Sequence, residues 1–287
     1  MLKRAIAAVK YLAGQNVVGR SLRTFPDDTF IVSYPKSGNT WSRFLVANLL
    51  CTQGPVTLQG ADDLVPSVDG QTRRCFAGMQ RPRVIKSHWS FDPSYKRVVY
   101  VVRDPRDVAL SQYHFQIKRK VLSDGHPLDE FVERFIAGET CPYGSWGENV
   151  ASWLAARYGS PDFLLVRYED MLKQTHAELS RIATFLGIQP EQERIAAAVE
   201  NSSADRMRQL EKLEGHKWKS TKDTRADISF VRTGTSGGWK SNLPAASAAR
   251  IEGAWSPLLR WLGYGAKAEG PASAAVLDAL LPQRVTR

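Results

Sequence analysis

The chain has 287 residues, of which 43% are hydrophobic and 24% are charged, as is typical of a soluble globular protein with one large domain or two small ones. Its three cysteines are widely spaced and form no Cys-x-x-Cys pair. This argues against a disulfide framework and against a zinc site, so we expect a reducing, cytoplasmic setting. Lys and Arg outnumber Asp and Glu by 39 to 29, and the net charge of +10 favours an anionic partner.

The N-terminal stretch "MLKRAIAAVKYLAG" combines basic residues with a short apolar run. Lys10 interrupts that run and no small-x-small cleavage site follows, so we predict an amphipathic helix rather than a signal peptide. Residues 1–25 would then form a helical lead-in that packs on its own domain or contacts a membrane surface. No apolar run approaches the ~20 residues that a transmembrane helix requires.

Segments with strand-like and helix-like apolar patterns alternate along the chain. The predicted strands are "TFIVSY" at 29–34, "RVIKSH" at 83–88, "RVVYVV" at 97–102 and "DFLLVRYED" at 162–170. The predicted helices are 41–51, 105–120, 147–159 and 171–187, with further helix to about residue 213. A polar, basic, glycine-rich segment follows at 214–242, and residues 266–287 are expected to form a loosely ordered tail.

This alternation predicts an α/β fold, in which one domain spanning residues 1–265 has a central parallel sheet flanked by helices. Ligands of such sheets bind at the carboxyl ends of the strands. We therefore expect the functional site in the loops after Tyr34, Lys86, Val102 and Arg167.

The stretch "SYPKSGNTW" at 33–41 predicts a P-loop-like strand–loop–helix junction. A nucleoside-triphosphate P-loop places its glycines before the lysine, but here Lys36 precedes Gly38. A helix N-terminus with free backbone N–H groups attracts phosphate, Lys36 adds a charge, and Ser37 and Thr40 add hydroxyl donors. Gly38 allows the backbone to approach a ligand closely. A phosphate-binding loop is the preferred interpretation, and a plain strand-to-helix turn is the alternative.

The stretch "VRDPRD" places Arg103 at the end of an apolar strand, where its guanidinium group should emerge at the edge of the sheet. Ser111 lies eight residues further on, about two helical turns away. An arginine and a hydroxyl placed in this way can bind one phosphate. The alternative is a salt bridge from Arg103 to Asp104 or Asp107.

The stretch "IKSHW" places His88 just after a strand, with Lys86 two residues earlier on the same side. A histidine at that edge can act as a general base near neutral pH, although a purely structural histidine is the alternative.

The stretch "FVRTGTSGGWKSN" at 230–242 combines three glycines with Arg232 and Lys240. It predicts a second anion-binding loop, and the alternative is a solvated connector.

Together, "YPKSGNTW", "KSHW", "VVRDPRDVALS", "VRYEDM" and "VRTGTSGGWK" resemble the sulfotransferases that use 3′-phosphoadenosine-5′-phosphosulfate (PAPS). The resemblance spans Phe30 to about Lys240, and the nearest pattern is the cytosolic type, in a bacterial-looking version. It implies transfer of a sulfuryl group from PAPS to a hydroxyl, or as second choice an amine, of a small molecule, lipid or natural product. It implies no metal and no nucleic-acid partner.

The resemblance also implies a role for each matching residue. His88 would be the general base, with Lys36 and Lys86 as its catalytic neighbours. The 5′-phosphosulfate loop would comprise Lys36, Ser37, Gly38, Asn39, Thr40 and Trp41, with Trp41 bordering the adenine. The 3′-phosphate would be held by Arg103, Ser111, Arg232, Thr233 and Gly234. The adenine side would be met by Tyr168 and Ser202.

Three positions depart from the family pattern. Thr233 stands where the family usually has lysine, Ala204 where an aromatic residue often stacks on the adenine, and Gly238 where an acidic residue is usual. These departures bear on the affinity for PAPS. The family's Lys-Thr-Val-Glu dimer motif is absent from "WKSNLPAASAARIEGAW", so the oligomeric state is open.

Two alternative functions agree less well with the sequence. A P-loop kinase or other nucleotide-binding enzyme disagrees with the Lys-before-Gly order, and no magnesium-binding carboxylate site is evident. A non-catalytic polyanion-binding protein would use the net charge but leaves the positions of His88 and Arg103 without a purpose.

The acceptor pocket is expected in loops 59–82, 113–147 and 214–230. Aromatic side chains there would suit a lipid, phenol, sterol or natural-product alcohol, whereas the basic residues at 217–225 would suit an acidic acceptor such as a sugar. The aromatic residues are Phe76, Tyr113, Phe115, Tyr143, Trp146 and Trp218.

Overall fold

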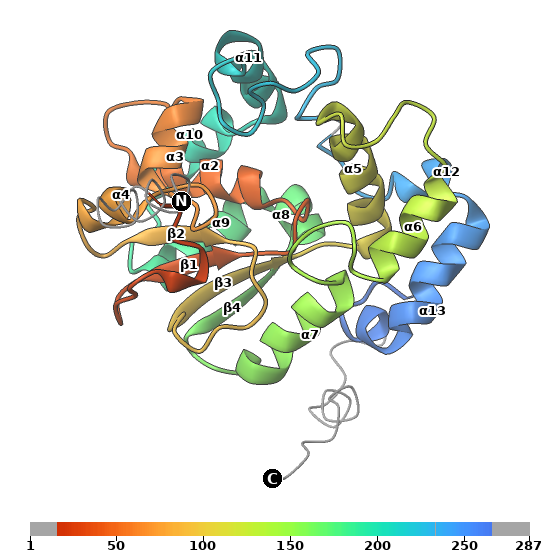
Figure 1. Ribbon diagram of the computed structural model, residues 1–287. Helices are drawn as coiled ribbons and strands as arrows, with labels where there is room; N and C mark the ends of the chain where they lie inside the picture. The colour runs from red at the N-terminus through yellow and green to blue at the C-terminus, as the bar shows by residue number, and fades with distance from the viewer. Residues whose placement is uncertain (1–15, 233, 266–287) are drawn as a thin grey trace, which may run out of the picture.

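The computed structural model describes residues 16–232 and 234–265, and its centre is a four-stranded parallel sheet (Figure 1). The strands are β1 (Thr29–Val32), β2 (Val84–Ser87), β3 (Arg97–Val102) and β4 (Phe163–Arg167), in the spatial order β2-β1-β3-β4. Because neighbouring strands run parallel throughout, all four carboxyl ends meet at one edge. The predicted α/β fold with a central parallel sheet is confirmed.

Both faces of the sheet are buried, which explains why its strands are apolar throughout. Successive side chains point to opposite faces of a strand. Phe30, Val32 and Tyr100 accordingly pack in one hydrophobic core, while Ile31 and Val99 pack in the other.

Helices cover each face (Figure 1). The first core receives α5 (Pro105–Lys118), α6 (Leu128–Ile136), α7 (Trp146–Arg157) and α13 (Ala245–Trp261). The second receives α2 (Asn39–Leu50), α3 (Leu58–Leu64), α9 (Thr175–Leu186), α10 (Gln192–Asn201) and α11 (Ala204–Glu214). Shorter elements are the 3-10 turn η1 (Gly19–Ser21) and the helices α4 (Arg73–Ala77), α8 (Tyr168–Lys173) and α12 (Trp239–Asn242).

Local sequence determines several helix ends. The Asp104 side chain accepts a hydrogen bond from the backbone at the start of α5, and Pro105 occupies the first helical turn. Ser145 and Glu148 form a reciprocal capping box at the start of α7. Gly187 ends α9 with φ = 78°, a left-handed conformation that favours glycine.

Three predicted boundaries are wrong. The strand predicted at 162–170 ends at Arg167, because residues 168–170 form the start of helix α8. Strand β1 ends at Val32, because Tyr34 already belongs to a turn in which the backbone N–H of Ser37 donates to its carbonyl oxygen at 3.2 Å. The single helix predicted at 171–187 is two helices, since the non-helical backbone of Gln174 (φ = −137°, ψ = 52°) separates α8 from α9.

Five helices, α3, α4, α6, α12 and α13, were not predicted. Helix α13 contains Pro257 and a kink at Trp255, and a proline inside a helical pattern normally argues against a helix. The lead-in was predicted to be helical, but its described part, residues 16–25, holds only the 3-10 turn η1. The remainder of that segment and the predicted tail at 266–287 lie outside the described residues.

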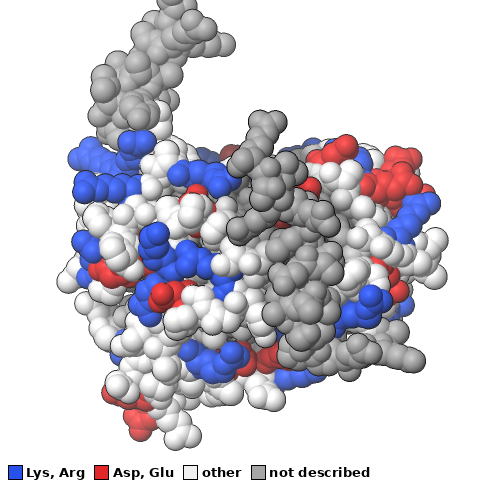
Figure 2. All heavy atoms as spheres, turned by 90° about the horizontal axis from the view of Figure 1, so that it is seen from below, with Lys and Arg blue, Asp and Glu red and all other residues white. Residues whose placement is uncertain are grey.

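None of the described helices has the length and apolar character needed to cross a bilayer. On the face shown in Figure 2, Lys and Arg atoms are interspersed with Asp and Glu atoms wherever grey atoms do not cover it. The net charge of +10 therefore forms no single basic block on that visible surface.

Candidate active site

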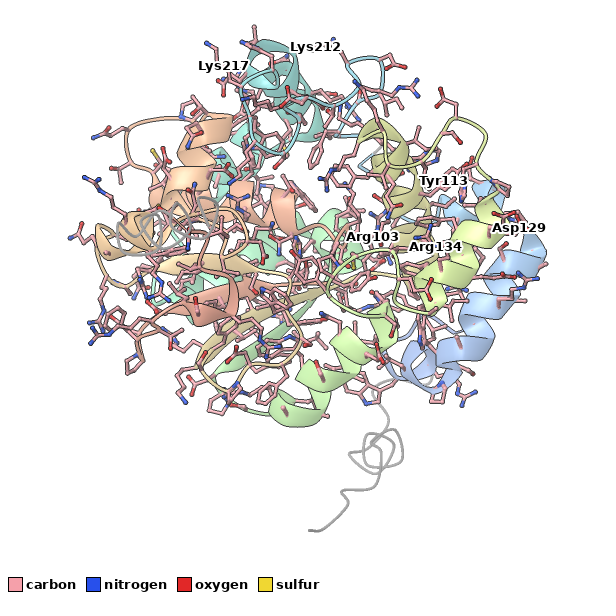
Figure 3. All side chains as sticks on the ribbon, in the orientation of Figure 1. Arg103, Tyr113, Asp129, Arg134, Lys212 and Lys217 are labelled. Atoms are coloured by element: carbon pink, nitrogen blue, oxygen red, sulfur yellow. The ribbon has the colours of Figure 1, made fainter. Side chains whose placement is uncertain are left out.

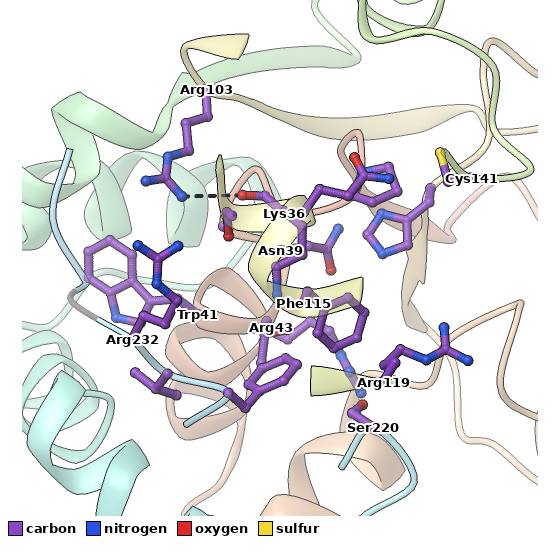
Figure 4. A pocket seen from close by; sticks show the side chains of 18 of the residues that line it. Lys36, Asn39, Trp41, Arg43, Arg103, Phe115, Arg119, Cys141, Ser220 and Arg232 are labelled. Carbon is purple, nitrogen blue, oxygen red and sulfur yellow. Dashed lines mark hydrogen bonds between the residues drawn. The ribbon is translucent and has the colours of Figure 1, made fainter. Parts of the chain in front are cut away.

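A cavity of about 800 Å³ lies at the carboxyl edge of the sheet, where the loops after β1, β2 and β3 meet the start of α8 (Figure 4). Most of the predicted site residues line it. These are Lys36, Gly38, Asn39, Thr40, Trp41, Lys86, His88, Arg103, Ser111, Tyr168, Arg232 and Gly234. Ser37 and Ser202 do not line it, and Thr233 lies outside the described residues.

The loop after β1 has a backbone that only certain residues tolerate. Lys36 has φ = 68°, which is uncommon for a residue other than glycine, and Arg103 Nη1 donates to its carbonyl oxygen at 3.3 Å (dashed line in Figure 4). Gly38 has φ = 100°, and a Cβ atom there would lie 2.4 Å from Cδ2 of Tyr168. The loop thus requires glycine after the lysine, the order that distinguishes it from a triphosphate P-loop.

The ammonium group of Lys36 lies between two aromatic rings. Nζ is 4.1 Å from the ring centroid of Phe115 and 4.5 Å from that of Phe230, which places both rings within cation–π range. Burial lowers the pKa of Lys36 to about 7, and the nearby cations Arg103, Arg232 and Lys86 contribute in the same direction. The negative charge of a bound anion would favour the protonated lysine and so raise this pKa.

His88 is oriented by the neighbouring strand. Its Nδ1 atom lies 2.7 Å from the carbonyl oxygen of Ser33, and Asn149 Nδ2 donates to the His88 carbonyl oxygen at 3.0 Å. Burial, together with the charge of Lys86, holds the pKa of His88 well below its usual range. The imidazole is therefore neutral at pH 7, which is the protonation state that a general base requires.

Lys86 lies beside this histidine and lines the cavity. Its Nζ atom is 3.5 Å from Ser67 Oγ, and it forms no salt bridge with any residue that the structure describes. Burial lowers the pKa of Lys86 to about 8, with a smaller effect from Arg43. The charges of Asp69 and Asp62 partly offset this lowering, but neither forms a salt bridge with Lys86. A buried ammonium group that forms no salt bridge favours an anion in the cavity.

Arg103 emerges from the end of β3 as predicted. Its guanidinium lies 4.4 Å from the ring centroid of Tyr168, and Nη2 donates to the Thr235 carbonyl oxygen at 3.0 Å. Asp107 Oδ2 lies 3.8 Å away, so Arg103 also forms the ion pair that was the alternative interpretation. Asp104 pairs with Arg106 instead.

Asp107 was missed as a functional residue. Its carboxylate accepts hydrogen bonds from the backbone N–H groups of Gly237 at 2.6 Å and Trp239 at 3.0 Å. It thereby attaches the glycine-rich segment, which carries Arg232, to α5. The sequence showed only a charge-rich "RDPRD". The contact could not be predicted, because Asp107 and Gly237 are 130 residues apart in the chain.

Arg232 completes a cluster of three cations with Lys36 and Arg103. Its Nη1 atom donates to the Leu110 carbonyl oxygen at 3.5 Å, and burial and Arg103 lower its pKa. Among the described residues, only Asp107 forms an ion pair with a member of this cluster, namely with Arg103. This excess of positive charge fits a ligand with several phosphate or sulfate groups.

The residues predicted for the adenine side divide into two groups. Trp41 and Tyr168 pack edge to face with ring centroids 5.8 Å apart, and both line the cavity. Ser202 is fully buried, and its hydroxyl accepts a hydrogen bond from Asn48 Nδ2 at 3.0 Å. Its carbonyl oxygen instead accepts from Trp41 Nε1 at 3.0 Å, so Ser202 supports Trp41 from behind.

Ser37 is also turned away from the cavity. It is fully buried, and its hydroxyl has no hydrogen-bond partner among the described residues. Its backbone N–H closes the turn on Tyr34.

Two of the six predicted acceptor-side aromatic residues, Phe115 and Tyr143, line the cavity. The other four do not: Phe76 and Trp146 pack in the core, Trp218 donates to Asp62 at 3.1 Å, and Tyr113 donates to the His126 carbonyl oxygen at 2.5 Å. Loop 59–82, which was predicted to contribute to the acceptor pocket, supplies a polar part of the cavity wall, namely Ser67, Asp69, Gly70 and Gln71.

No cluster of three or more His, Cys, Asp or Glu side chains suited to a metal ion occurs within residues 16–232 and 234–265.

Comparison with known proteins identifies the family. Residues 26–261 match the model of the sulfotransferase domain. A 3-beta-hydroxysteroid sulfotransferase of Cavia porcellus is 31% identical over 236 residues, which cover 79% of this chain and 81% of that protein. A 3-alpha-hydroxysteroid sulfotransferase of the same species is 32% identical over 240 residues, which cover 77% and 80%.

Solved structures share the fold. A mouse sulfotransferase complexed with PAP superposes with a TM-score of 0.68 at 23% identity, covering 91% of this chain and 90% of that chain. A retinol dehydratase in a complex with retinol and PAP gives a TM-score of 0.67 at 21% identity, covering 84% of each chain. With a family model that matches most of its length and two relatives at or above 30% identity, this chain belongs to the sulfotransferase family.

Proposed function

We propose that this sulfotransferase transfers a sulfuryl group from PAPS to a hydroxyl group of a small-molecule acceptor, with His88 as the general base. The observation that carries the proposal is the convergence of three cations, Lys36, Arg103 and Arg232, with a neutral histidine in one cavity. The cations can bind the phosphate groups of the donor, and a neutral imidazole can accept the proton of the acceptor hydroxyl.

The chain's own groups fit the donor in two ways. Burial lowers the pKa of Lys36 and of Arg232, and repulsion among the three cations in the free protein adds a smaller effect in the same direction. An anionic ligand relieves that repulsion, which contributes to its binding. Trp41 and Tyr168 offer aromatic surface at the adenine side of the same cavity.

PAPS, when bound, supplies the sulfuryl group and 3′-phosphoadenosine-5′-phosphate (PAP) as the leaving group. His88 Nε2 would take the proton from the acceptor hydroxyl as its oxygen becomes a nucleophile. Lys36 and the backbone N–H groups at the start of α2 would stabilise the negative charge left on the departing phosphate. Lys86, two residues from His88, would hold the transferred group in position.

The acceptor is proposed to be a hydroxyl compound, with an amine as the second choice. The two Cavia porcellus relatives are hydroxysteroid sulfotransferases by name, and the retinol dehydratase was solved with retinol. The rings of Phe115 and Tyr143 supply apolar surface for the body of such a molecule.

The experiment is a transfer assay with PAPS and a phenol such as 2-naphthol, with the sulfate ester and PAP quantified over time. We expect the two products to appear in equal amounts. Binding of PAP to the protein without formation of any ester across phenols, alcohols and amines would contradict the proposal.

A further inference from the structure

We name the part of the cavity beside Phe115 and Tyr143 the acceptor half. It carries positive charges in addition to those proposed to bind the donor. Three cations line it there, which we name the rim cations: Arg119, Lys219 and Lys222. Figure 4 shows Arg119 and Ser220, the neighbour of Lys219, on the side of the pocket away from Trp41 and Arg232. Arg232 thus lies apart from the rim cations, whereas Lys36 and Arg119 both contact the ring of Phe115.

Contacts fix the positions of two of the three rim cations, Arg119 and Lys219. Arg119 is the C-cap of α5, and its guanidinium carbon is 5.7 Å from the ring centroid of Phe115, which lines the same cavity. Lys219 Nζ donates to the Gly70 carbonyl oxygen, next to Asp69. The turn that carries Lys219 and Lys222 therefore closes against the loop that forms the polar wall of the acceptor half.

No acidic side chain neutralises the rim cations. Throughout the part of the chain that the structure describes, none of the three forms a salt bridge. Their basic neighbours do: Lys118 pairs with Glu211, and Arg225 pairs with Asp124 and Asp227.

The acidic residues of the cavity wall are engaged elsewhere. Asp62 pairs with Arg43, and Asp107 binds the backbone at Gly237 and Trp239. Asp69 and Lys86 attract each other, because the lysine lowers the pKa of Asp69 and the carboxylate raises the pKa of Lys86. The rim cations are exposed to solvent and have no salt-bridge partner among the described residues, although Asp69 Oδ2 in the same wall also lacks a hydrogen-bond partner there.

We propose that the acceptor carries an anionic group, a carboxylate in the simplest case, at the end remote from the reacting hydroxyl, and that the rim cations bind it. The proposal rests on the proposed function. The hydroxyl faces His88, a flat apolar body packs on Phe115 and Tyr143, and the anion reaches Arg119, Lys219 and Lys222. The substrate class is then a hydroxylated carboxylate rather than an uncharged sterol.

The test uses two acceptors that differ only in the anion, 2-naphthol and 6-hydroxy-2-naphthoate, at saturating PAPS. The wild-type protein is expected to prefer the naphthoate. Neutralising the rim (Arg119→Gln, Lys219→Gln and Lys222→Gln together) should lower kcat/KM for the naphthoate about tenfold, because exposed ion pairs contribute a few tenths of a kcal/mol each. The value for 2-naphthol should change less than about twofold, because that acceptor makes no ion pair.

A matched control neutralises two cations of the same region that do not line the cavity, Lys212 and Lys217, which lie at the outer end of α11 and beyond it (Figure 3). This control (Lys212→Gln with Lys217→Gln) should leave both acceptors unchanged. Equal losses for both acceptors in the rim variant would overturn the proposal, because the rim would then serve the entry of PAPS. Equal use of both acceptors by the wild type would also overturn it.

Direct binding separates this proposal from the proposed function. In the presence of PAP, the wild-type protein should bind 6-hydroxy-2-naphthoate more tightly than 2-naphthol, and the rim variant should lose that difference. This result supports an anionic acceptor even if neither compound yields a sulfate ester, an outcome that would count against the proposed function alone. Equal binding of both compounds contradicts the rim proposal whatever the turnover.

Discussion

The Nδ1 atom of His88 lies 2.7 Å from the carbonyl oxygen of Ser33. A carbonyl oxygen can only accept, so Nδ1 carries the proton and Nε2 keeps its lone pair. The pairing of Val32 with Ser87 in the parallel sheet brings these two residues together, one position beyond the end of each strand. The sheet itself thus selects the tautomer that a general base needs.

Replacing this histidine tests its role without removing that contact. In His88→Asn the side-chain amide can still donate to the Ser33 carbonyl oxygen, so the fold and PAP affinity should persist. Loss of a general base should lower kcat by about 10²–10⁴-fold. Steady-state kinetics and calorimetry with PAP measure the two quantities, and near-normal turnover in this variant would remove His88 from the mechanism.

The pKa of Lys36 predicts how PAP affinity depends on pH. In the free protein this pKa is about 7, and the phosphates of a bound ligand would raise it. Below pH 7 the lysine is protonated in both states, so affinity should not change through this group. Above pH 7 binding must take up a proton, so affinity should fall by up to about tenfold per pH unit.

Calorimetry in buffers of different ionisation enthalpy measures the proton uptake. The matched variant is Lys36→Arg, because a guanidinium stays charged throughout this range. It should flatten the profile between pH 7 and 8, leaving the part due to Lys86, whose pKa is about 8. A profile identical to that of the wild type would show that Lys36 does not titrate with binding.

Replacing Gly38 with a larger residue should create a steric clash with Tyr168. Alanine there would have its Cβ atom 2.4 Å from the Tyr168 ring and an unfavourable φ of 100°. Alanine at Gly187, with φ = 78° and no atom within 4 Å, meets only the backbone cost of about 1–2 kcal/mol.

We therefore expect Gly38→Ala to lower the melting temperature more than Gly187→Ala and to abolish PAP binding. The Gly187→Ala variant should bind PAP normally. Thermal unfolding followed by circular dichroism, with PAP titration at a temperature where both variants are folded, makes the comparison. Equal effects of the two variants would mean that Tyr168 moves aside without cost.

A buried ion pair next to the sheet sets a stability prediction. Arg83 and Asp28 are 3% and 0% exposed, and Arg83 makes two hydrogen bonds to the carboxylate. Arg83→Met leaves that carboxylate buried and unpaired, which should cost about 3–5 kcal/mol of unfolding free energy.

The adjacent pair Arg81–Asp27 is the natural control. Its side chains are 45% and 41% exposed, so Arg81→Met should cost far less. Urea unfolding of both variants gives the two free energies. Similar losses would show that burial does not decide the strength of this pair.

The sequence carried the parts of the site that are local. His88 and Arg103 follow a strand directly, and Lys36 and Gly38 lie in the loop after β1. Parallel strands bring their carboxyl ends to one edge regardless of the rest of the fold. The boundaries were less accurate, because the break at Gln174 depends on the packing of α8 and α9 rather than on a helix-breaking residue.

Contacts between distant segments could not be predicted. Ser202 was expected at the adenine because of its sequence position, but Asn48, 154 residues earlier, takes up its hydroxyl. Phe230 meets Lys36 only because the segment after α11 folds back over the cavity. Such pairings depend on tertiary packing, which the periodicity of the sequence does not report.

The most direct test of the central claim is a single-turnover reaction of the wild-type protein with radiolabelled PAPS and 2-naphthol, without added metal ions. The account predicts that the label moves from PAPS to naphthyl sulfate, with one PAP formed per ester and the rate lowered about 10²–10⁴-fold in His88→Asn. Label that stays in PAPS with every hydroxyl acceptor, although PAP binds the cavity, would contradict it.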